Sequence, residues 1–203
     1  MIAPFTTLTA LAAPLPAANI DTDIIVPARF LTITSKQGLG RHAFAEWRER
    51  GAFVLDDPRW TGAQILVAGE NFGCGSSREQ AAWALADLGI RAIVAPSFGE
   101  IFRTNALRNG ILPVTLDTPE WARSVKAAEA GASLTIDLAA QRILLPDEPP
   151  IAFALAEQER LALLNGWDEI DGIRSRYAAA TAAFEARQRS ASPWLWQADH
   201  AAL

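Results

Sequence analysis

The middle of the chain alternates short apolar runs with helix-forming stretches, and this alternation constrains the fold more than any other feature. Three apolar runs, at 63–69, 91–96 and 111–116, have the length and composition of buried strands. Between them lie two stretches rich in helix-favouring residues, at 76–89 and 97–110, each ending at a glycine. Strands that alternate with helices favour a mainly parallel sheet with helices packed on it, so we expect an α/β fold.

Both predicted helices begin with a serine followed three residues later by glutamate or glutamine, which is the pattern of a capping box. The candidate pairs are Ser76 with Glu79, Ser77 with Gln80, and Ser97 with Glu100. We therefore expect these serine side chains to accept hydrogen bonds from the first backbone amides of the two helices.

The remaining segments carry weaker patterns. We predict a helix at 118–131, a β-hairpin at 132–146 with its turn near Ala139 and Ala140, and further helices at 152–166 and 168–190. Before the middle region, residues 20–35 predict a turn, a short strand and a loop, and residues 40–51 predict a short helix. The last residues have no periodic pattern, and we expect them to be poorly ordered.

These patterns divide the chain into three predicted parts. Residues 1–166 form the main domain, residues 167–190 a C-terminal helical extension, and residues 191–203 a flexible tail. The main domain is long enough to bury a core of its own.

Reactive side chains are scarce in this chain of 203 residues. Cysteine occurs once, at Cys74, histidine at His42 and His200, and lysine at Lys36 and Lys126. A structural zinc site needs about four Cys or His ligands, and iron–sulfur clusters are usually held by several cysteine thiolates. The chain alone cannot supply either set. A single cysteine also allows no internal disulfide, which is typical of a reducing compartment.

Charge and hydropathy exclude several classes of function. The formal net charge is −5 and the isoelectric point about 5.1, whereas nucleic-acid-binding proteins usually present a basic face. The N-terminal stretch is mildly apolar, but it has no basic start and contains Pro4, Pro14 and Pro16, so we do not expect a signal peptide. No apolar run approaches the length of a membrane span. We expect a cytoplasmic protein that binds neither nucleic acid nor membrane.

Residues 69–78, GENFGCGSSR, form a glycine-rich turn between a predicted strand and a predicted helix. A helix N-terminus carries partial positive charge and free N–H donors, so this turn suits a carboxylate or a phosphate. Arg78 would oppose the helix dipole unless it faces an anionic ligand. The alternative is that Ser76 and Ser77 only cap the helix and Arg78 is solvated. The residues alone favour neither interpretation.

The same turn does not match the known nucleotide-binding motifs. It has no lysine, which a P-loop requires, and its third glycine position in the dinucleotide fingerprint holds Arg78. Cys74 could gain thiolate character beside a helix N-terminus, but a cysteine nucleophile normally needs a histidine base and only His42 is a candidate. We expect Cys74 to have a packing role.

A second candidate segment is NIDTDIIVPARF, residues 19–30, in which Asp21 and Asp23 flank Thr22. One interpretation is an Asx-type turn that leads into a strand. The other places a carboxylate at the mouth of a site.

Three segments, in this order, carry a resemblance to a known family. NIDTDIIVPARFL at 19–31, GENFGCGSSRE at 69–79 and GIRAIVAPSFGEIFRTNALRNGILPV at 89–114 resemble the small subunit of bacterial 3-isopropylmalate dehydratase, which corresponds to the swivelling domain of aconitase. The likeness runs from about Phe5 to about residue 188. It implies a three-layer β/β/α swivelling domain that works with a separate large subunit. That subunit is expected to carry a [4Fe–4S] cluster, so no cofactor or metal is expected on this chain, and Cys74 would be a bystander.

The resemblance also implies roles for individual residues in a reaction on a small dicarboxylic hydroxy acid. By position in the motifs, Ser76 would be the general base and Asp23 would support the acid side of the site. The implied substrate-binding residues are Ser77, Arg78, Arg29 and Thr22. Residues 28–36 resemble the loop that faces the variable group of the substrate.

Gln80 departs from the family pattern, which usually has histidine after Gly-Ser-Ser-Arg-Glu. Glutamine can donate and accept hydrogen bonds but cannot titrate. The change could be neutral, or it could mark a related hydro-lyase acting on another substituted malate such as citramalate, dimethylmalate or homoaconitate. Two further alternatives stay open: an anion-binding α/β module that acts alone, and a thiol enzyme that uses Cys74.

Overall fold

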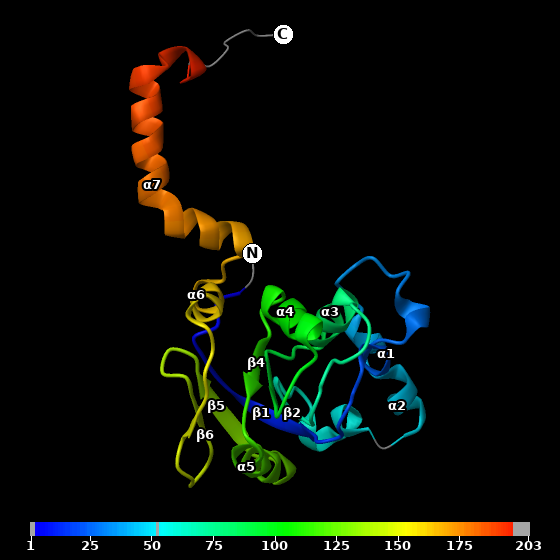
Figure 1. Cartoon of the computed structure of the whole chain (residues 1–203). Helices are drawn as coiled ribbons and strands as arrows, with labels where there is room; N and C mark the ends of the chain where they lie inside the picture. Colours follow the sequence, from blue (N-terminus) through cyan, green and yellow to red (C-terminus); the bar gives the residue numbers. More distant parts are fainter. Residues whose placement is uncertain (1–2, 52, 197–203) are drawn as a thin grey trace.

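The computed structural model describes residues 3–51 and 53–196 (Figure 1). Its centre is a mixed sheet with the strand order β4-β3-β2-β1-β5-β6-β7. The strands are β1 (Thr7–Leu15), β2 (Ile65–Ala68), β3 (Ala92–Ala95), β4 (Leu112–Thr115), β5 (Ser133–Asp137), β6 (Arg142–Leu144) and β7 (Ile151–Ala152). The α-helices are α1 (Thr22–Ile25), α2 (Ala45–Glu49), α3 (Glu79–Asp87), α4 (Glu100–Arg108), α5 (Thr118–Glu129), α6 (Glu157–Asn165) and α7 (Glu169–Ala191).

Strand β1 joins the two halves of the sheet. Its C-terminal part pairs in parallel with β2, from Ala12 opposite Ile65 onward. Its N-terminal part pairs antiparallel with β5, from Thr7 opposite Asp137. Strands β2, β3 and β4 continue the parallel half, whereas β5, β6 and β7 form the antiparallel half. Strand β1 therefore belongs to both halves of the sheet and connects the parallel layer to the antiparallel layer.

The parallel strands are buried on both faces, as expected for strands covered on two sides. Along β2, Leu66 belongs to a core shared with α3 and α4, and its neighbours Ile65 and Val67 belong to a core shared with the antiparallel strands. Helices α5 and α6 close the second core with Ala128 and Leu163. The result is the predicted three-layer β/β/α arrangement, with α3 and α4 on one side of the parallel sheet (Figure 1).

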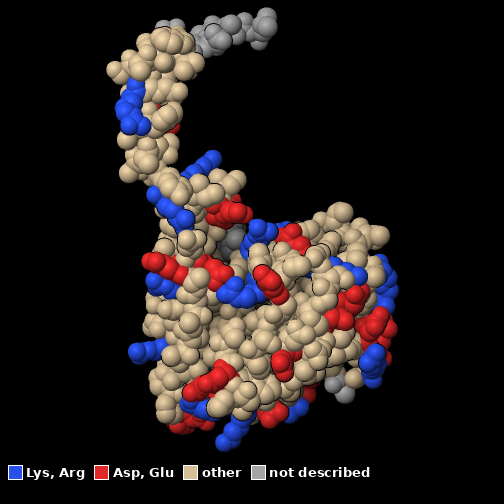
Figure 2. Space-filling model, in the orientation of Figure 1, with Lys and Arg blue, Asp and Glu red and all other residues tan. Residues whose placement is uncertain are grey.

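Helix α7 projects from this domain as an arm (Figures 1 and 2). Asp168 begins the helix with a capping box, in which its side chain accepts a hydrogen bond from the backbone N–H of Asp171. No residue of α7 is buried, and Ile173, Tyr177 and Phe184 are more than half exposed. Within residues 3–51 and 53–196, no helix is both long and apolar enough to cross a bilayer.

Most predicted elements of the middle region are confirmed, and the helix starts differ. Helix α3 begins at Glu79 and α4 at Glu100, and neither has a side-chain cap. The predicted capping boxes are therefore wrong. Ser97 instead accepts a hydrogen bond from the backbone N–H of Asn71, at 2.8 Å, and so ties two turns together.

The other differences lie outside the middle region. The strand predicted within residues 20–35 is wrong, because Asp21 caps the short helix α1 by accepting from the N–H of Ile24 at 2.7 Å. Helix α6 starts at Glu157, since residues 151–152 form β7. The tail predicted for residues 191–203 lies partly outside the described residues, and its described end at Pro193–Trp196 is a 3₁₀ turn.

Candidate active site

The glycine-rich turn leaves the carboxyl end of β2 and leads into α3. Gly73 has a φ of +72°, and a Cβ atom at this position would lie 2.1 Å from Cγ of Phe102 in α4. Gly99 is equally confined, because its Cβ would lie 2.5 Å from the carbonyl oxygen of Gly73. Only glycine allows this approach, since Gly73 has a φ that L residues rarely adopt and the space at both positions is already filled. The turn is therefore held tightly against the start of α4.

The segment before α1 runs beside this turn. The N–H of Gly73 donates to the carbonyl of Ile20 at 2.7 Å, and the N–H of Thr22 donates to the carbonyl of Cys74 at 3.0 Å. The Thr22 hydroxyl then donates to the carbonyl of Ser76 at 3.0 Å. Because Thr22 is only 1% exposed, these bonds lie in a protected environment. The two candidate segments of the sequence thus form one structural unit.

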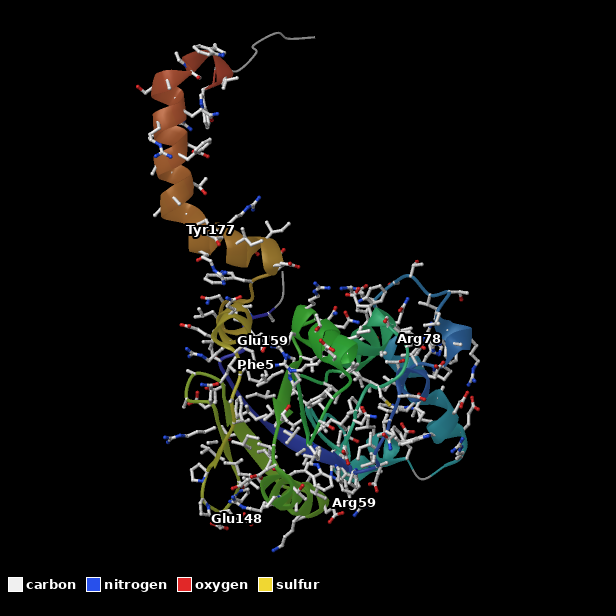
Figure 3. All side chains as sticks on the ribbon, viewed as in Figure 1. Phe5, Arg59, Arg78, Glu148, Glu159 and Tyr177 are labelled. Carbon is white, nitrogen blue, oxygen red and sulfur yellow. The ribbon has the colours of Figure 1, made fainter. Side chains whose placement is uncertain are left out.

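Arg78 and Asp23 form an ion pair across this unit. The Arg78 side chain is 18% exposed and that of Asp23 is 48% exposed, so the pair lies at the surface with the guanidinium better shielded. Arg78 precedes α3 in an extended conformation, with φ −116° and ψ 106°. It is therefore neither inside the first helical turn nor simply solvated, and its interaction with a carboxylate offsets the unfavourable charge near the helix N-terminus. Figure 3 shows Arg78 beside α1 and α3.

Ser76 and Ser77 are both exposed. Within the described part of the chain, neither hydroxyl makes a hydrogen bond, whereas the carbonyl of Ser76 accepts from Thr22. The backbone is thus fixed while the two hydroxyls stay available to a ligand. The hydroxyls are available because neither serine caps α3.

Cys74 has the opposite character. Burial, and next the negative charge of Asp21, raise the pKa of the Cys74 thiol above its usual range. The predicted proximity to a helix N-terminus does not offset these effects. A thiol held in its protonated form is a weak nucleophile, and His42, the histidine considered as its base, stacks on Phe30 with ring centroids 4.2 Å apart.

Arg29 does not meet the other candidate residues. Its guanidinium bonds to Glu46 at 3.2 Å and to Glu49 at 2.8 Å, both on α2, and lies 4.9 Å from the ring centroid of Phe30. The structure thus brings together Thr22, Asp23 and the Ser76–Arg78 turn, with Arg29 paired to α2.

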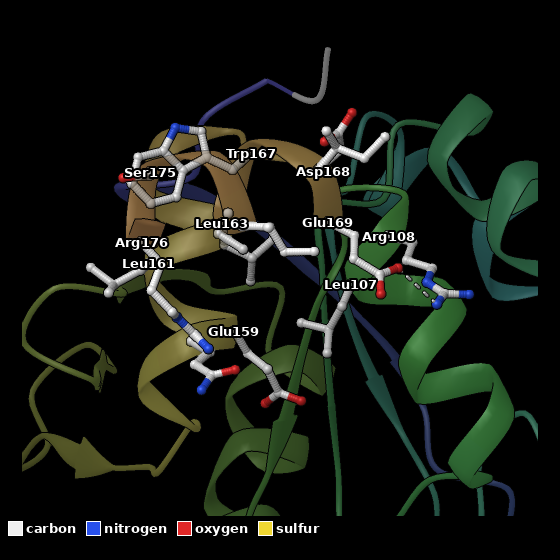
Figure 4. A pocket seen from close by; sticks show the side chains of 15 residues that line it. Leu107, Arg108, Glu159, Leu161, Leu163, Trp167, Asp168, Glu169, Ser175 and Arg176 are labelled. Atoms are coloured by element: carbon white, nitrogen blue, oxygen red, sulfur yellow. Dashed lines mark hydrogen bonds and ion pairs between the residues drawn. The ribbon is translucent and has the colours of Figure 1, made fainter. Parts of the chain in front are cut away.

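One pocket lies away from this turn. It has a volume of about 890 Å³ between α4, α6 and the start of α7 (Figure 4). Its walls are mostly apolar, with Leu107, Leu161 and Trp167 among the lining side chains. Glu159 at its rim is held by both guanidinium nitrogens of Arg103 at 2.7 Å. The pocket contains none of the candidate catalytic residues.

Metal-ligating side chains do not gather in the described ranges. Within residues 3–51 and 53–196, no group of three or more His, Cys, Asp and Glu residues is placed to hold a metal ion. Asp21 makes a local turn of the Asx type considered from the sequence, but it leads into helix α1 and not into a strand. Sequence reasoning missed the role of Glu79, which accepts hydrogen bonds from Trp83 and Asn109 and does not form the predicted capping box with Ser76. No local pattern pointed to Asn109 as a partner of Glu79, because the contact joins two different helices.

Comparison with known proteins defines the class to which this fold and turn belong. A family model described as "Aconitase C-terminal domain" matches residues 2–119, which include every element of the candidate site. The crystal structure of 3-isopropylmalate dehydratase from Methanocaldococcus jannaschii superimposes with a TM-score of 0.67 and 29% sequence identity, covering 87% of this chain and 99% of that one. The chain is an aconitase C-terminal domain of the swivelling β/β/α type.

Curated relatives narrow the class to one family. The 3-isopropylmalate dehydratase small subunit of Rhodospirillum centenum is 48% identical over 198 residues, which cover 94% of this chain and 97% of the relative. That of Neisseria meningitidis serogroup C is 44% identical over 209 residues, with coverage of 95% and 98%. This chain belongs to the family of 3-isopropylmalate dehydratase small subunits, and the resemblance stated from its motifs is confirmed.

Proposed function

We propose that this chain joins a large subunit in the cytoplasm to form a 3-isopropylmalate dehydratase, which interconverts 2-isopropylmalate and 3-isopropylmalate through 2-isopropylmaleate in leucine biosynthesis. One observation carries the proposal: the ion pair between Asp23 and Arg78 places two candidate segments beside the free hydroxyls of Ser76 and Ser77. The names of the relatives support it, because a small subunit implies a larger partner chain.

The proposed reaction removes a proton from the carbon next to a carboxylate, and the hydroxyl group on the neighbouring carbon departs as hydroxide, so that the two fragments together amount to one water molecule. The product is an alkene acid, to which water adds back with the opposite regiochemistry. In this scheme Ser76 is the base that takes the proton and later returns one. Serine is a poor base unless its alkoxide is stabilised, and the N-terminus of α3 together with Arg78 supplies positive potential close to its position.

Substrate binding is assigned to the neighbouring residues. Arg78 uses part of its donor set on Asp23, and guanidinium has five N–H donors, so the others can hold a substrate carboxylate. Ser77 adds a hydroxyl donor to the same carboxylate. Thr22, predicted to bind substrate, donates its hydroxyl to the carbonyl of Ser76. We therefore assign Thr22 to holding the Ser76 backbone in place.

Asp23 is assigned to the acid side of the reaction. Its carboxylate is half exposed and paired with Arg78, so it can accept a hydrogen bond from a water molecule or a departing hydroxyl group. Arg29 stays a prediction without an assigned role, because its guanidinium bonds to α2.

The [4Fe–4S] cluster expected of the enzyme does not fit the described part of this chain, where no suitable ligand group exists. We assign the cluster to the large subunit. There its Lewis acidity would assist departure of the hydroxyl group. The residues of this chain would then supply the base and the carboxylate-binding groups on the opposite side of a shared site.

An anion-binding module that acts alone explains the similarities less well. Arg78 and the serine hydroxyls could bind a free anion, but such a module would need no partner chain, whereas the relatives are named as small subunits. Gln80 makes no side-chain hydrogen bond in the described part of the chain, which gives no reason to prefer another substituted malate.

Reconstitution tests the proposal. The chain is mixed with the large subunit encoded in the same genome, after its cluster has been rebuilt without oxygen, and hydration of 2-isopropylmaleate is followed by loss of alkene absorbance. We expect turnover only in the mixture. With an intact cluster, absence of turnover on this and related alkene acids would contradict the proposal, and a thermal shift of the chain alone with malates would then favour the binding module.

A further inference from the structure

The loop at residues 31–38 connects the 3₁₀ turn after α1 to the segment before α2 and is exposed over much of its length. Its beginning is fixed where Phe30 stacks on His42. Its end is fixed where the N–H of Gly40 donates to the carboxylate of Asp87 at 2.7 Å. Leu31 and Ile33 pack partly against the core. The exposed far part, from Thr34 onward, would be free to move without another attachment.

Lys36 provides that attachment. Its ammonium group donates to the side-chain oxygen of Asn109 at 2.9 Å and lies 5.0 Å from the ring centroid of Trp83. The amide nitrogen of Asn109 donates to Glu79 at 3.2 Å, and the indole N–H of Trp83 donates to the same carboxylate oxygen at 3.0 Å. The four side chains form a closed network between the loop, α3 and the end of α4.

The charges of this network are matched. The pKa of Glu79 is lowered, mainly by the hydrogen bond from Trp83. The hydrogen bond from Asn109 and the positive charges of Lys36 and Arg108 lower it further, whereas burial of the carboxylate raises it. Glu79 is therefore ionised at neutral pH. An ionised carboxylate strengthens the hydrogen bond from Asn109, and Asn109 in turn offers its oxygen to the ammonium group of Lys36.

The position of Glu79 connects this network to the candidate active site. Arg78 pairs with Asp23 beside α1, and the next residue, Glu79, holds the far part of the loop through Asn109 and Lys36. Two consecutive residues at the start of α3 thus fix the two segments that flank the Ser76 turn. In Figure 1 the loop arches beside α1 and α3.

We propose that Glu79, Asn109 and Lys36 form a latch that fixes loop 31–38 against α3 and α4, and that Lys36 and Asn109 are positioning residues for substrate binding. The second part rests on the proposed function. The resemblance to the family implies that this loop faces the variable group of the substrate, so the latch would act on the site by holding the loop in place. Its loss weakens substrate binding more than it slows the chemical step, since neither residue approaches the Ser76 hydroxyl in the network described.

Limited trypsin digestion of the chain alone tests the latch. Asn109→Ala removes the bridge to Lys36, and cleavage after Lys36 should become about tenfold faster, because proteolysis requires local opening of the loop. Asn165→Ala is a matched control, since both asparagine side chains donate to the carbonyl four residues earlier at 2.8 Å, Asn109 to Asn105 and Asn165 to Leu161. Equal cleavage rates in wild type and Asn109→Ala would overturn the latch.

Kinetics of the assembled enzyme test the positioning role. Lys36→Met and Asn109→Ala should each raise KM for 2-isopropylmaleate about tenfold with kcat within about twofold, as expected when a positioning contact far from the chemistry is lost. Lys36→Arg should restore most of the affinity. Lys126→Met is the control, because the only other lysine lies exposed on α5. Unchanged KM in both variants would overturn the positioning role.

The two experiments separate this inference from the proposed function. If the wild-type mixture hydrates no alkene acid, the proposed function and the positioning role both fail, whereas the trypsin result still decides whether the latch exists. Faster cleavage in Asn109→Ala with normal kinetics would leave a latch that serves stability alone and would contradict positioning.

Discussion

Arg78 and Asp23 are 55 residues apart in the chain and form an ion pair at the edge of the candidate site. Their partnership joins the turn after β2 to the segment that begins α1. Because the guanidinium is better shielded than the carboxylate, the pair can fix Arg78 while Asp23 remains accessible to a substrate or water. The two proposed roles, binding of a substrate carboxylate by Arg78 and contact of Asp23 with water or a departing hydroxyl group, both depend on this pair.

Replacement of Arg78 by lysine tests whether the guanidinium binds the substrate carboxylate. An ammonium group is a single point charge and cannot hold Asp23 and a carboxylate in the forked geometry of guanidinium. We expect Arg78→Lys to raise KM of the assembled enzyme by about 10- to 100-fold, which corresponds to the loss of one or two charge-assisted hydrogen bonds. Arg142→Lys, at an exposed position on β6, is the control. Equal KM values for Arg78→Lys and wild type would remove Arg78 from the carboxylate-binding set.

Cys74 should be dispensable and slow to react. Its pKa is raised, so the thiolate fraction at neutral pH is smaller than in a free cysteine. We expect Cys74→Ala to retain turnover within about twofold and wild type to react with iodoacetamide more slowly than a model thiol at pH 8. A rate that increases only at more alkaline pH would confirm the direction of the shift. Loss of turnover in Cys74→Ala would instead favour the thiol enzyme considered from the sequence.

The pair of Arg103 and Glu159 links α4 to α6 and predicts a pH effect on stability. Hydrogen bonding from Arg103 lowers the pKa of Glu159 despite partial burial. A lowered folded-state pKa adds stability above the unfolded-state value of about 4.3, and this stability is lost as pH falls through the folded-state pKa.

Glu159→Gln measures that effect by urea unfolding across pH. We expect the variant to lose about 1 kcal/mol at pH 7, since the side chains are 33% and 27% exposed and solvent screens the pair. The difference from wild type should shrink below about pH 4. Glu185→Gln is the control, because its pair with Arg189 is exposed and longer, at 3.8 Å. A difference that is independent of pH would contradict the assignment to this carboxylate.

Glycine at position 73 should be essential for the shape of the turn. Gly73 and Gly131 have nearly equal φ values, +72° and +74°, but a Cβ at Gly131 would meet no atom within 4 Å. Gly131→Ala should therefore cost about 1–2 kcal/mol from backbone strain alone. Gly73→Ala adds the clash with Phe102, and we expect a further loss of stability together with loss of turnover. Equal unfolding free energies for the two variants would contradict the tight packing of the turn.

The parallel half of the fold could be predicted from the sequence because β2, β3 and β4 are short, continuous apolar runs separated by helices. Strand β1 was not predicted. Its pattern of burial is irregular, since it pairs with β2 at one end and with β5 at the other, and Pro14 interrupts the local signal for a strand. The central strand of the sheet therefore depends on tertiary pairing, which a single sequence window does not contain.

In the site, too, local patterns predicted which residues matter but not the contacts that they make with distant segments. The serines and Arg78 could be chosen from their turn, but the sequence predicted helix caps where the structure leaves free hydroxyls. The reason is that Thr22 fixes the carbonyl of Ser76 from a distant segment. The contact between Lys36 and Asn109 likewise joins residues 73 positions apart. Such contacts decide the geometry of the site and have no signature in local spacing.

The most direct test of the account is Ser76→Ala in the assembled enzyme. We would measure hydration of 2-isopropylmaleate together with association of the two subunits by size-exclusion chromatography. The exposed Ser76 hydroxyl makes no hydrogen bond in the described part of the chain, so the variant should fold and associate as wild type does. Turnover should fall by at least about 100-fold, the contribution expected of a positioned general base. A Ser76→Ala enzyme that associates normally and retains wild-type turnover would contradict the central claim that this turn supplies the base.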